Sequence, residues 1–132
     1  MNLLNIESEM ATRIEYRVTR AIGTQFPTLN FTTEISDTPA VFPNVYVHEE
    51  RLTEVGHTLF GTGFHAADFA IQLVIKTNTT KSDILTIRNA CIQAIKDDGF
   101  RVIINEPQKI NNVYQCTLHF YGVRGAGDTF YN

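Results

Sequence analysis

Apolar residues recur at steps of three and four in two stretches of the chain, which is the pattern of an amphipathic helix. The first stretch covers about residues 7–25, and the second covers about residues 81–98. Thr80 and Asp83 have the spacing of a capping box, and Gly99 follows the last turn of the second stretch. The pattern therefore predicts two helices, each with one apolar face.

Five other stretches have the composition or the alternation of β-strands: residues 30–36, 44–50, 67–77, 100–105 and 113–122. We expect a turn at residues 106–109, so that the last two strands form a hairpin. The order of elements predicts an α+β fold, with a mainly antiparallel four- to five-stranded sheet and two helices packed on one face. This domain would cover residues 1–122. Residues 123–132 have no period and contain two glycines, which predicts a mobile C-terminal tail.

The segment 51–66 has no clean period and is unusually apolar for a loop, with glycines at positions 56, 61 and 63. Long connections are uncommon and often functional. Two interpretations stay open: the segment packs on its own domain, or it lies in an interface between subunits. The candidate interface residues are Glu49, Glu50, Arg51, Leu52, Val55, Leu59, Phe60, Phe64 and, from the tail, Phe130 and Tyr131.

Composition narrows the classes of function. A length of 132 residues fits one domain. The formal net charge of -3 and the pI near 5.7 give no electrostatic footprint for nucleic acid or anionic lipid. No apolar run approaches the ~20 residues of a membrane span, and the first ten residues lack the pattern of a secretory signal. We expect the chain to fold in the cytoplasm of the producing cell.

No motif for nucleophilic, phosphate-binding, dinucleotide-binding or zinc-protease chemistry is present. The four histidines are His48, His57, His65 and His119. His48 precedes two glutamates and could be drawn as a metal ligand, but such spacings arise by chance. Polar residues on the wet face of a strand or in a loop are the favoured interpretation. We therefore predict no catalytic residue, no metal and no cofactor.

Three pairs of residues fit structural positions better than a functional site. Cys91 and Cys116 fall in apolar patterns and are interpreted as buried small hydrophobes, since no CxxC spacing supports a redox or zinc role. Asp97 and Asp98 end the second helix, and we expect them to form a solvated terminus. Arg13 and Arg17 lie off the apolar stripe of the first helix.

The order of segments resembles the tail terminator, or tail completion, proteins of long-tailed bacteriophages. The resemblance covers the chain from the first helix to about Gly122 and rests on four stretches. These are Phe26-Pro27 after the first helix, FPNVYV at 42–47 before two glutamates, FAIQLVI at 69–75 before the second helix, and Asp98-Gly99-Phe100 before the hairpin that ends at Tyr121-Gly122.

The resemblance implies a structural protein of the virion without cofactor or catalysis. Such a protein forms a homo-hexameric ring that caps the tail-tube protein, stops tail polymerisation and offers a surface to the head-tail connector or head completion protein. It would lie at the head-proximal end of the tail, after synthesis in the host cytoplasm.

Two alternatives stay open. One is another phage neck or head-completion connector protein. The other, from a different class, is a small ligand-binding or enzymatic α+β domain with His48, His57 and His65 near a pocket. If the apolar segment is an interface, replacing Leu59 and Phe60 with Asp should impair ring formation while the fold stays cooperative.

Overall fold

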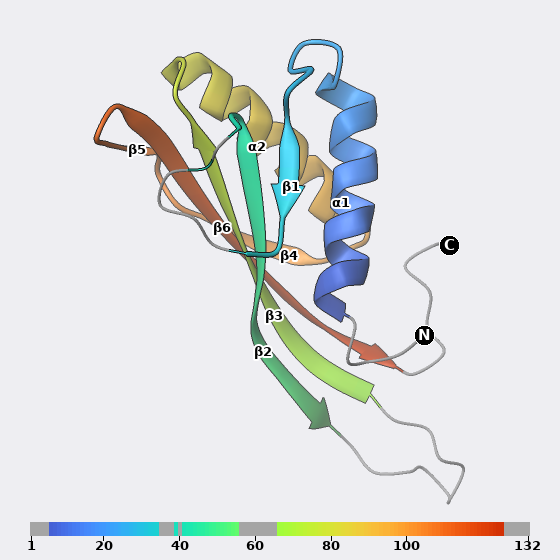
Figure 1. The fold of residues 1–132 in the computed structure, drawn as a ribbon. Helices are drawn as coiled ribbons and strands as arrows, with labels where there is room; N and C mark the ends of the chain where they lie inside the picture. The colour runs from blue at the N-terminus through green and yellow to red at the C-terminus, as the bar shows by residue number, and fades with distance from the viewer. Residues whose placement is uncertain (1–5, 35–38, 40, 56–65, 126–132) are drawn as a thin grey trace, which may run out of the picture.

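A computed structural model describes residues 6–34, 39, 41–55 and 66–125 of the chain (Figure 1). Its elements follow in the order α1 (Ile6–Ile22), β1 (Asn30–Thr32), β2 (Asn44–Val55), β3 (Ala66–Thr77), α2 (Lys81–Lys96), β4 (Arg101–Ile104), β5 (Gln108–Ile110) and β6 (Val113–Gly125). The strand order in the sheet is β1-β2-β3-β6-β4, and β5 also pairs with β6. The β1–β2 pair is parallel and the other pairs are antiparallel. The predicted α+β class and mainly antiparallel sheet are confirmed.

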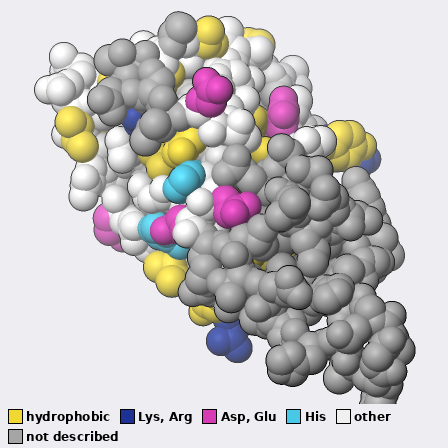
Figure 2. Space-filling model, turned by 60° about the horizontal axis from the view of Figure 1, so that its bottom comes forward, with side chains coloured by type: hydrophobic (Ala, Val, Ile, Leu, Met, Phe, Trp, Pro, Cys, Tyr) yellow, Lys and Arg dark blue, Asp and Glu magenta, His cyan; other side chains and the backbone are white. Residues whose placement is uncertain are grey.

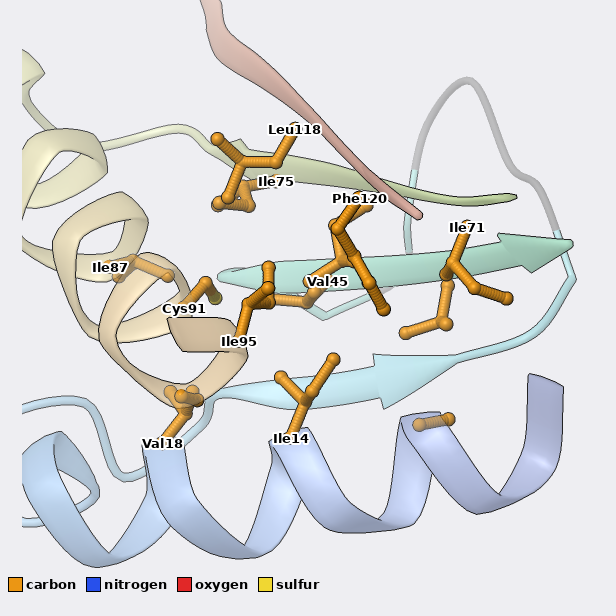
Figure 3. Close-up of a cluster of buried hydrophobic side chains, with 14 of the residues drawn as sticks. Ile14, Val18, Val45, Ile71, Ile75, Ile87, Cys91, Ile95, Leu118 and Phe120 are labelled. Atoms are coloured by element: carbon orange, nitrogen blue, oxygen red, sulfur yellow. The ribbon is translucent and has the colours of Figure 1, made fainter. Parts of the chain in front are cut away.

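The core lies between the two helices and one face of the sheet. The alternating residues of β2, β3 and β6 that face the helices are fully buried: Val45, Val47, Phe69, Ile71, Leu73, Ile75, Cys116, Leu118 and Phe120. Figure 3 shows Ile14 and Val18 of α1 and Ile87 of α2 pointing toward these strand residues. Both helices therefore cover the same face, as the apolar stripes predict.

Helix α2 is capped at its N-terminus by Thr80, and Gly99 follows its C-terminus, as the sequence indicates. The backbone N–H of Asp83 donates to Thr80 Oγ1 at 3.1 Å, which satisfies one of the free donors of the first turn. Gly99 has a φ of 82°, a left-handed conformation that glycine adopts without a steric cost. The helix itself ends at Lys96, two residues earlier than predicted.

A network of amide side chains fastens the short β1 to β2. Asn44 is buried, and its Nδ2 donates to Asn30 Oδ1 at 2.8 Å and to Thr32 Oγ1 at 3.3 Å. Asn30 Nδ2 in turn donates to the carbonyl oxygens of Pro43 and Val41, at 2.8 and 3.0 Å. Because buried polar groups are costly without partners, these bonds allow two asparagines to sit at this edge of the sheet.

The prediction of a loop from residue 51 is wrong for its first part, because β2 continues to Val55 and β3 begins at Ala66. The physical reason is a β-bulge between Glu49 and Arg51, where the register against β3 shifts. A bulge inserts one extra residue and breaks the two-residue period. Leu52, which pairs with Phe69, therefore stands out of phase with Val45 and Val47. Residues 56–65 lie outside the described part.

The turn predicted at 106–109 is also displaced, because Gln108–Ile110 forms β5 against β6. This extra strand makes the sheet six-stranded instead of four- or five-stranded. The actual turn uses Asn111 and Asn112, which have φ values of 51° and 65°. Two consecutive residues with positive φ are typical of a type I′ hairpin, and asparagine tolerates that conformation. At the other end, β6 runs to Gly125, three residues beyond the predicted strand end.

The prediction that Asp98 is exposed to solvent at the end of the second helix is wrong, because its side chain is buried. Its side chain is 2 % exposed and forms ion pairs with Arg17 at 2.9 Å and with Arg13 at 3.4 Å. Arg17 Nη1 also donates to the carbonyl oxygen of Ala94. The guanidinium groups of α1 therefore hold the C-terminal end of α2, and Arg13 is buried although it lies off the apolar stripe.

Three phenylalanines close the core where the strands leave the helical layer. The ring of Phe69 meets those of Phe100 and Phe120 edge to face, with centroids 5.2 and 6.3 Å apart. Gly122 lies against the same cluster, since a Cβ built there would stand 2.8 Å from Phe100 Cδ1. The backbone of β6 can approach Phe100 only because position 122 has no side chain.

We therefore expect Gly122→Ala to lower the free energy of unfolding by about 1–3 kcal/mol, the usual cost of overpacking. Chemical denaturation measures the loss. The added methyl group displaces the ring of Phe100, so Phe100→Leu in the same chain should recover part of it. Strictly additive effects of the two substitutions would contradict this account, because residues in direct contact couple.

Candidate functional site

The predicted interface residues fall into two groups. Glu49, Glu50, Arg51, Leu52 and Val55 lie on β2, in the half of the strand that follows its pairing with β1. Leu59, Phe60, Phe64, Phe130 and Tyr131 lie outside the described residues. The described members therefore form one stretch of strand instead of a loop.

The strands β2, β3 and β6 extend past the ends of both helices (Figure 1). Twelve residues of β3 span about 40 Å at the rise of an extended strand, whereas the 16 residues of α2 span about 24 Å. The ladder continues to Val55, Ala66 and Gly125, which share one level of the sheet. This three-stranded extension, made of residues 52–55, 66–68 and 123–125, has no helix opposite it among the described residues.

A histidine and a glutamate pair on the sheet face that the helices do not cover. His119 Nδ1 lies 2.6 Å from Glu50 Oε1, and both side chains are partly exposed. Glu50 is the extra residue of the bulge in β2, so its side chain reaches across β3 to β6. His48, Gln72 and His119 stand in one row across the three strands. Figure 2 shows histidine and acidic side chains gathered on one face of the molecule.

This pair can orient an imidazole, as carboxylates do in general-base catalysis. Its surroundings favour a structural role. The ring of His48, on the same face, stacks on that of Tyr46, with ring centroids 5.7 Å apart. A nucleophilic thiol is not within reach, because Cys116 is buried on the opposite, helix-covered face. A partly exposed pair of this kind contributes about 0–1 kcal/mol when the imidazole is charged. We assign it the role of fastening the bulge of β2 to β6.

The sequence could not indicate this pair, because its members are 69 positions apart. Alternation places His119 on the wet face of its strand, but the bulge and the strand order bring Glu50 to it. His48 lies on the same face, whereas His57 and His65 lie outside the described residues. In the described part of the chain, no group of three or more His, Cys, Asp or Glu side chains could hold a metal ion.

Exposed apolar side chains lie on β4, β5 and β6, on the side of the sheet away from β1 and β2, and the sequence pattern does not single them out. Ile103 and Ile104 of β4 are 52 % and 45 % exposed, and Ile110 of β5 and Tyr121 of β6 are also exposed. β4 is the last strand in the order of the sheet, so one of its edges has no strand beside it among the described residues. Edge strands with exposed apolar residues are prone to pair with another chain.

Both cysteines are buried free thiols, as predicted. Burial raises the pKa of Cys91, and the neighbouring Cys116 raises it further. Burial also raises the pKa of Cys116, although the charge of Arg88 partly offsets this effect. Thiolates are the reactive form, so both groups stay protonated and inert at neutral pH.

We therefore expect a chromogenic disulfide reagent to leave the native protein unlabelled and to label both thiols in denaturant. Following the reaction by absorbance at neutral pH tests this. Rapid labelling of either thiol in the native protein would show that the core around α2 and β6 opens, or that one thiol lies at the surface.

No helix within the described ranges combines the length and the apolar character that crossing a bilayer requires. No protein-family model matches the chain, and no curated protein matches it.

Proposed function

We propose that this chain is a structural assembly protein that forms a ring on the end of a phage tail tube, stops tube growth and offers the ring's other side to the head. The observation that carries the proposal is the three-stranded extension beyond the helical layer. The resemblance of the sequence to tail terminators supplies the identity of the partner. The extension supplies a surface that can make the contact.

A sheet that continues past its covering helices gains little for the stability of its own domain. Among the residues whose side chains the structure describes, the apolar core of β3 and β6 reaches no further in this direction than Phe69 and Phe120. Its backbone is instead placed to contact another chain. The bulge at Glu49 and Arg51 supports this role, since bulges increase the twist of a strand and redirect its side chains. The pair of His119 and Glu50 holds that bend in place.

The test uses tubes polymerised from the tail-tube protein of the phage that encodes this chain. Adding the chain should shorten the tubes and place a ring of density on one end, as electron microscopy measures. Leu59→Asp with Phe60→Asp should leave the tubes long. Tyr16→Asp is the matched control, because Tyr16 is 65 % exposed on α1, away from the sheet, and should cap like the unchanged chain.

Three results would contradict parts of the proposal. Tubes of unchanged length with the unmodified chain would reject the capping function. Binding to a purified head connector but not to the tube would instead identify a neck or head-completion protein. Unfolding of the variant with both aspartates would show that Leu59 and Phe60 belong to the core of this domain and not to an interface.

A further inference from the structure

We infer that copies of this chain join edge to edge: β4 of one copy pairs antiparallel with the part of β2 in the next copy that does not pair with β1. The inference rests on the proposed ring and names the strands that close it. The β4–β2 pairing is argued from the two edges of the sheet, β4 and β2, which differ in length, direction and charge.

One edge is β4, whose side chains are unusually exposed for an apolar strand. Arg101, Ile103 and Ile104 are exposed in a strand of four residues, and only Val102 is partly covered. Ile103 stands level with His119, and Ile104 with the buried Leu118, so exposed isoleucines occupy both faces of the strand. A strand added beside β4 would cover both isoleucines and supply the missing backbone hydrogen bonds.

The other edge is β2. Its neighbour β1 pairs only with Asn44, Val45 and Tyr46. The following stretch, from Val47 to Val55, pairs with β3 on one side and has no strand on its other side among the described residues. β1 therefore acts as a stop that confines an incoming strand to this stretch, which is longer than β4. The stretch contains five of the residues that sequence analysis proposed as an interface.

The direction of the strands fits such a joint. β4 is antiparallel to β6, β6 to β3, and β3 to β2, so β4 and β2 of one copy run in opposite directions. A second copy placed beside the first in a similar orientation would bring β4 against β2 as an antiparallel pair. Such a joint uses two different patches, so it repeats from copy to copy and closes when the rotation between copies allows a ring.

The charges of the two edges also fit. β2 contains three glutamates and one arginine, a formal charge of -2. The segment from Arg101 to Ile110 contains one arginine, one lysine and one glutamate, a formal charge of +1. Opposite charges favour this pairing, whereas a two-fold pairing of β4 with β4 would bring two basic segments together. The structure therefore favours a head-to-tail joint over a symmetric dimer.

Light scattering after size-exclusion chromatography tests the joint. The unchanged chain should form a closed assembly whose mass is a multiple of 14.9 kDa. Ile103→Lys with Ile104→Lys should shift it to the monomer, because lysines on an edge strand oppose pairing. Tyr16→Lys, an equally polar change on α1, should assemble normally. Circular dichroism shows that each variant is folded.

Disulfide trapping identifies the partner strand, because the two native thiols are buried. One chain carries Ile103→Cys, and a second carries Arg51→Cys, Thr53→Cys or Val55→Cys in turn. These positions pair with Ala70, Asp68 and Ala66 and alternate with Leu52, which pairs with the buried Phe69. At least one mixture should give a cross-linked dimer on a non-reducing gel. Cross-linking of the Ile103→Cys chain with itself would instead indicate the symmetric dimer and overturn the inference.

Three further outcomes separate this inference from the proposed function. An unchanged chain that remains monomeric, or a ring that survives both lysines, overturns the β4–β2 joint. Neither of these two outcomes affects the tube-length assay. A ring that dissociates with both lysines but never shortens tubes supports the joint and rejects the capping function.

Discussion

Replacing Asp98 with alanine is expected to lower the free energy of unfolding by about 3–5 kcal/mol, because it removes the carboxylate of a buried ion-pair group. Arg17 Nη2 donates to Asp98 Oδ1 at 3.0 Å, and Arg17 Nη1 lies 2.9 Å from Oδ2. The side chain of Arg13, 5 % exposed, stands beside the same carboxylate. Without Asp98, both guanidinium groups lose this carboxylate where α1 meets α2. Denaturation in urea, with the slope unchanged, measures the loss.

Asp97→Ala is the matched control, since it removes a neighbouring carboxylate that is exposed. Asp97 accepts a hydrogen bond from Gln93 Nε2 at 2.8 Å on the surface of α2. Surface changes of this kind usually stay within about 0.5 kcal/mol. If the two alanine substitutions proved equally mild, the ion pairs of Asp98 would contribute nothing net to the fold, and apolar packing alone would hold the two helices together.

The sequence predicts those elements of this fold that depend on local periodicity. Phe69, Ile71, Leu73 and Ile75 alternate along β3, because the bulge lies in the neighbouring β2 and β3 itself has no extra residue. Helix α2 is equally clear, since its apolar stripe and its cap at Thr80 are separated by only a few residues. In both cases the signal and the structure that it specifies lie in the same short stretch of chain.

Other features of the fold depend instead on contacts between distant segments. The bulge after Glu49 removes the alternation of β2, so its second half looks like a loop in the sequence. Arg17 and Asp98 are 81 positions apart, and nothing local indicates that the arginine reaches a buried partner. Likewise, the exposure of Ile103 follows from the place of β4 at the end of the strand order, which periodicity does not determine.

Phe69→Ala is expected to cost about 3–5 kcal/mol of stability, the usual range for a fully buried phenylalanine. Because of the position of Phe69, the substitution should also loosen the three-stranded extension more than the rest of the sheet. Phe69 pairs with Leu52 on one side and Gly122 on the other, at the root of the three-stranded extension. Its ring, edge to face with those of Phe100 and Phe120, is the last large buried side chain of β3 before the strands leave the helices.

Leu118→Ala is the control that separates loosening of the extension from a loss of stability of the whole domain. Leu118 is as fully buried as Phe69, but it pairs with Leu73 at the level of the helices, and its loss should cost about 2–5 kcal/mol. Native-state hydrogen exchange then compares amides in residues 52–55 and 66–68 with those around Val45. Phe69→Ala should speed exchange in the first group more than in the second, whereas Leu118→Ala should affect both alike, because regions open with separate free energies. Equal acceleration in both variants would mean that the aromatic cluster does not anchor the extension, and that the surface proposed to meet the tail tube is held by the sheet alone.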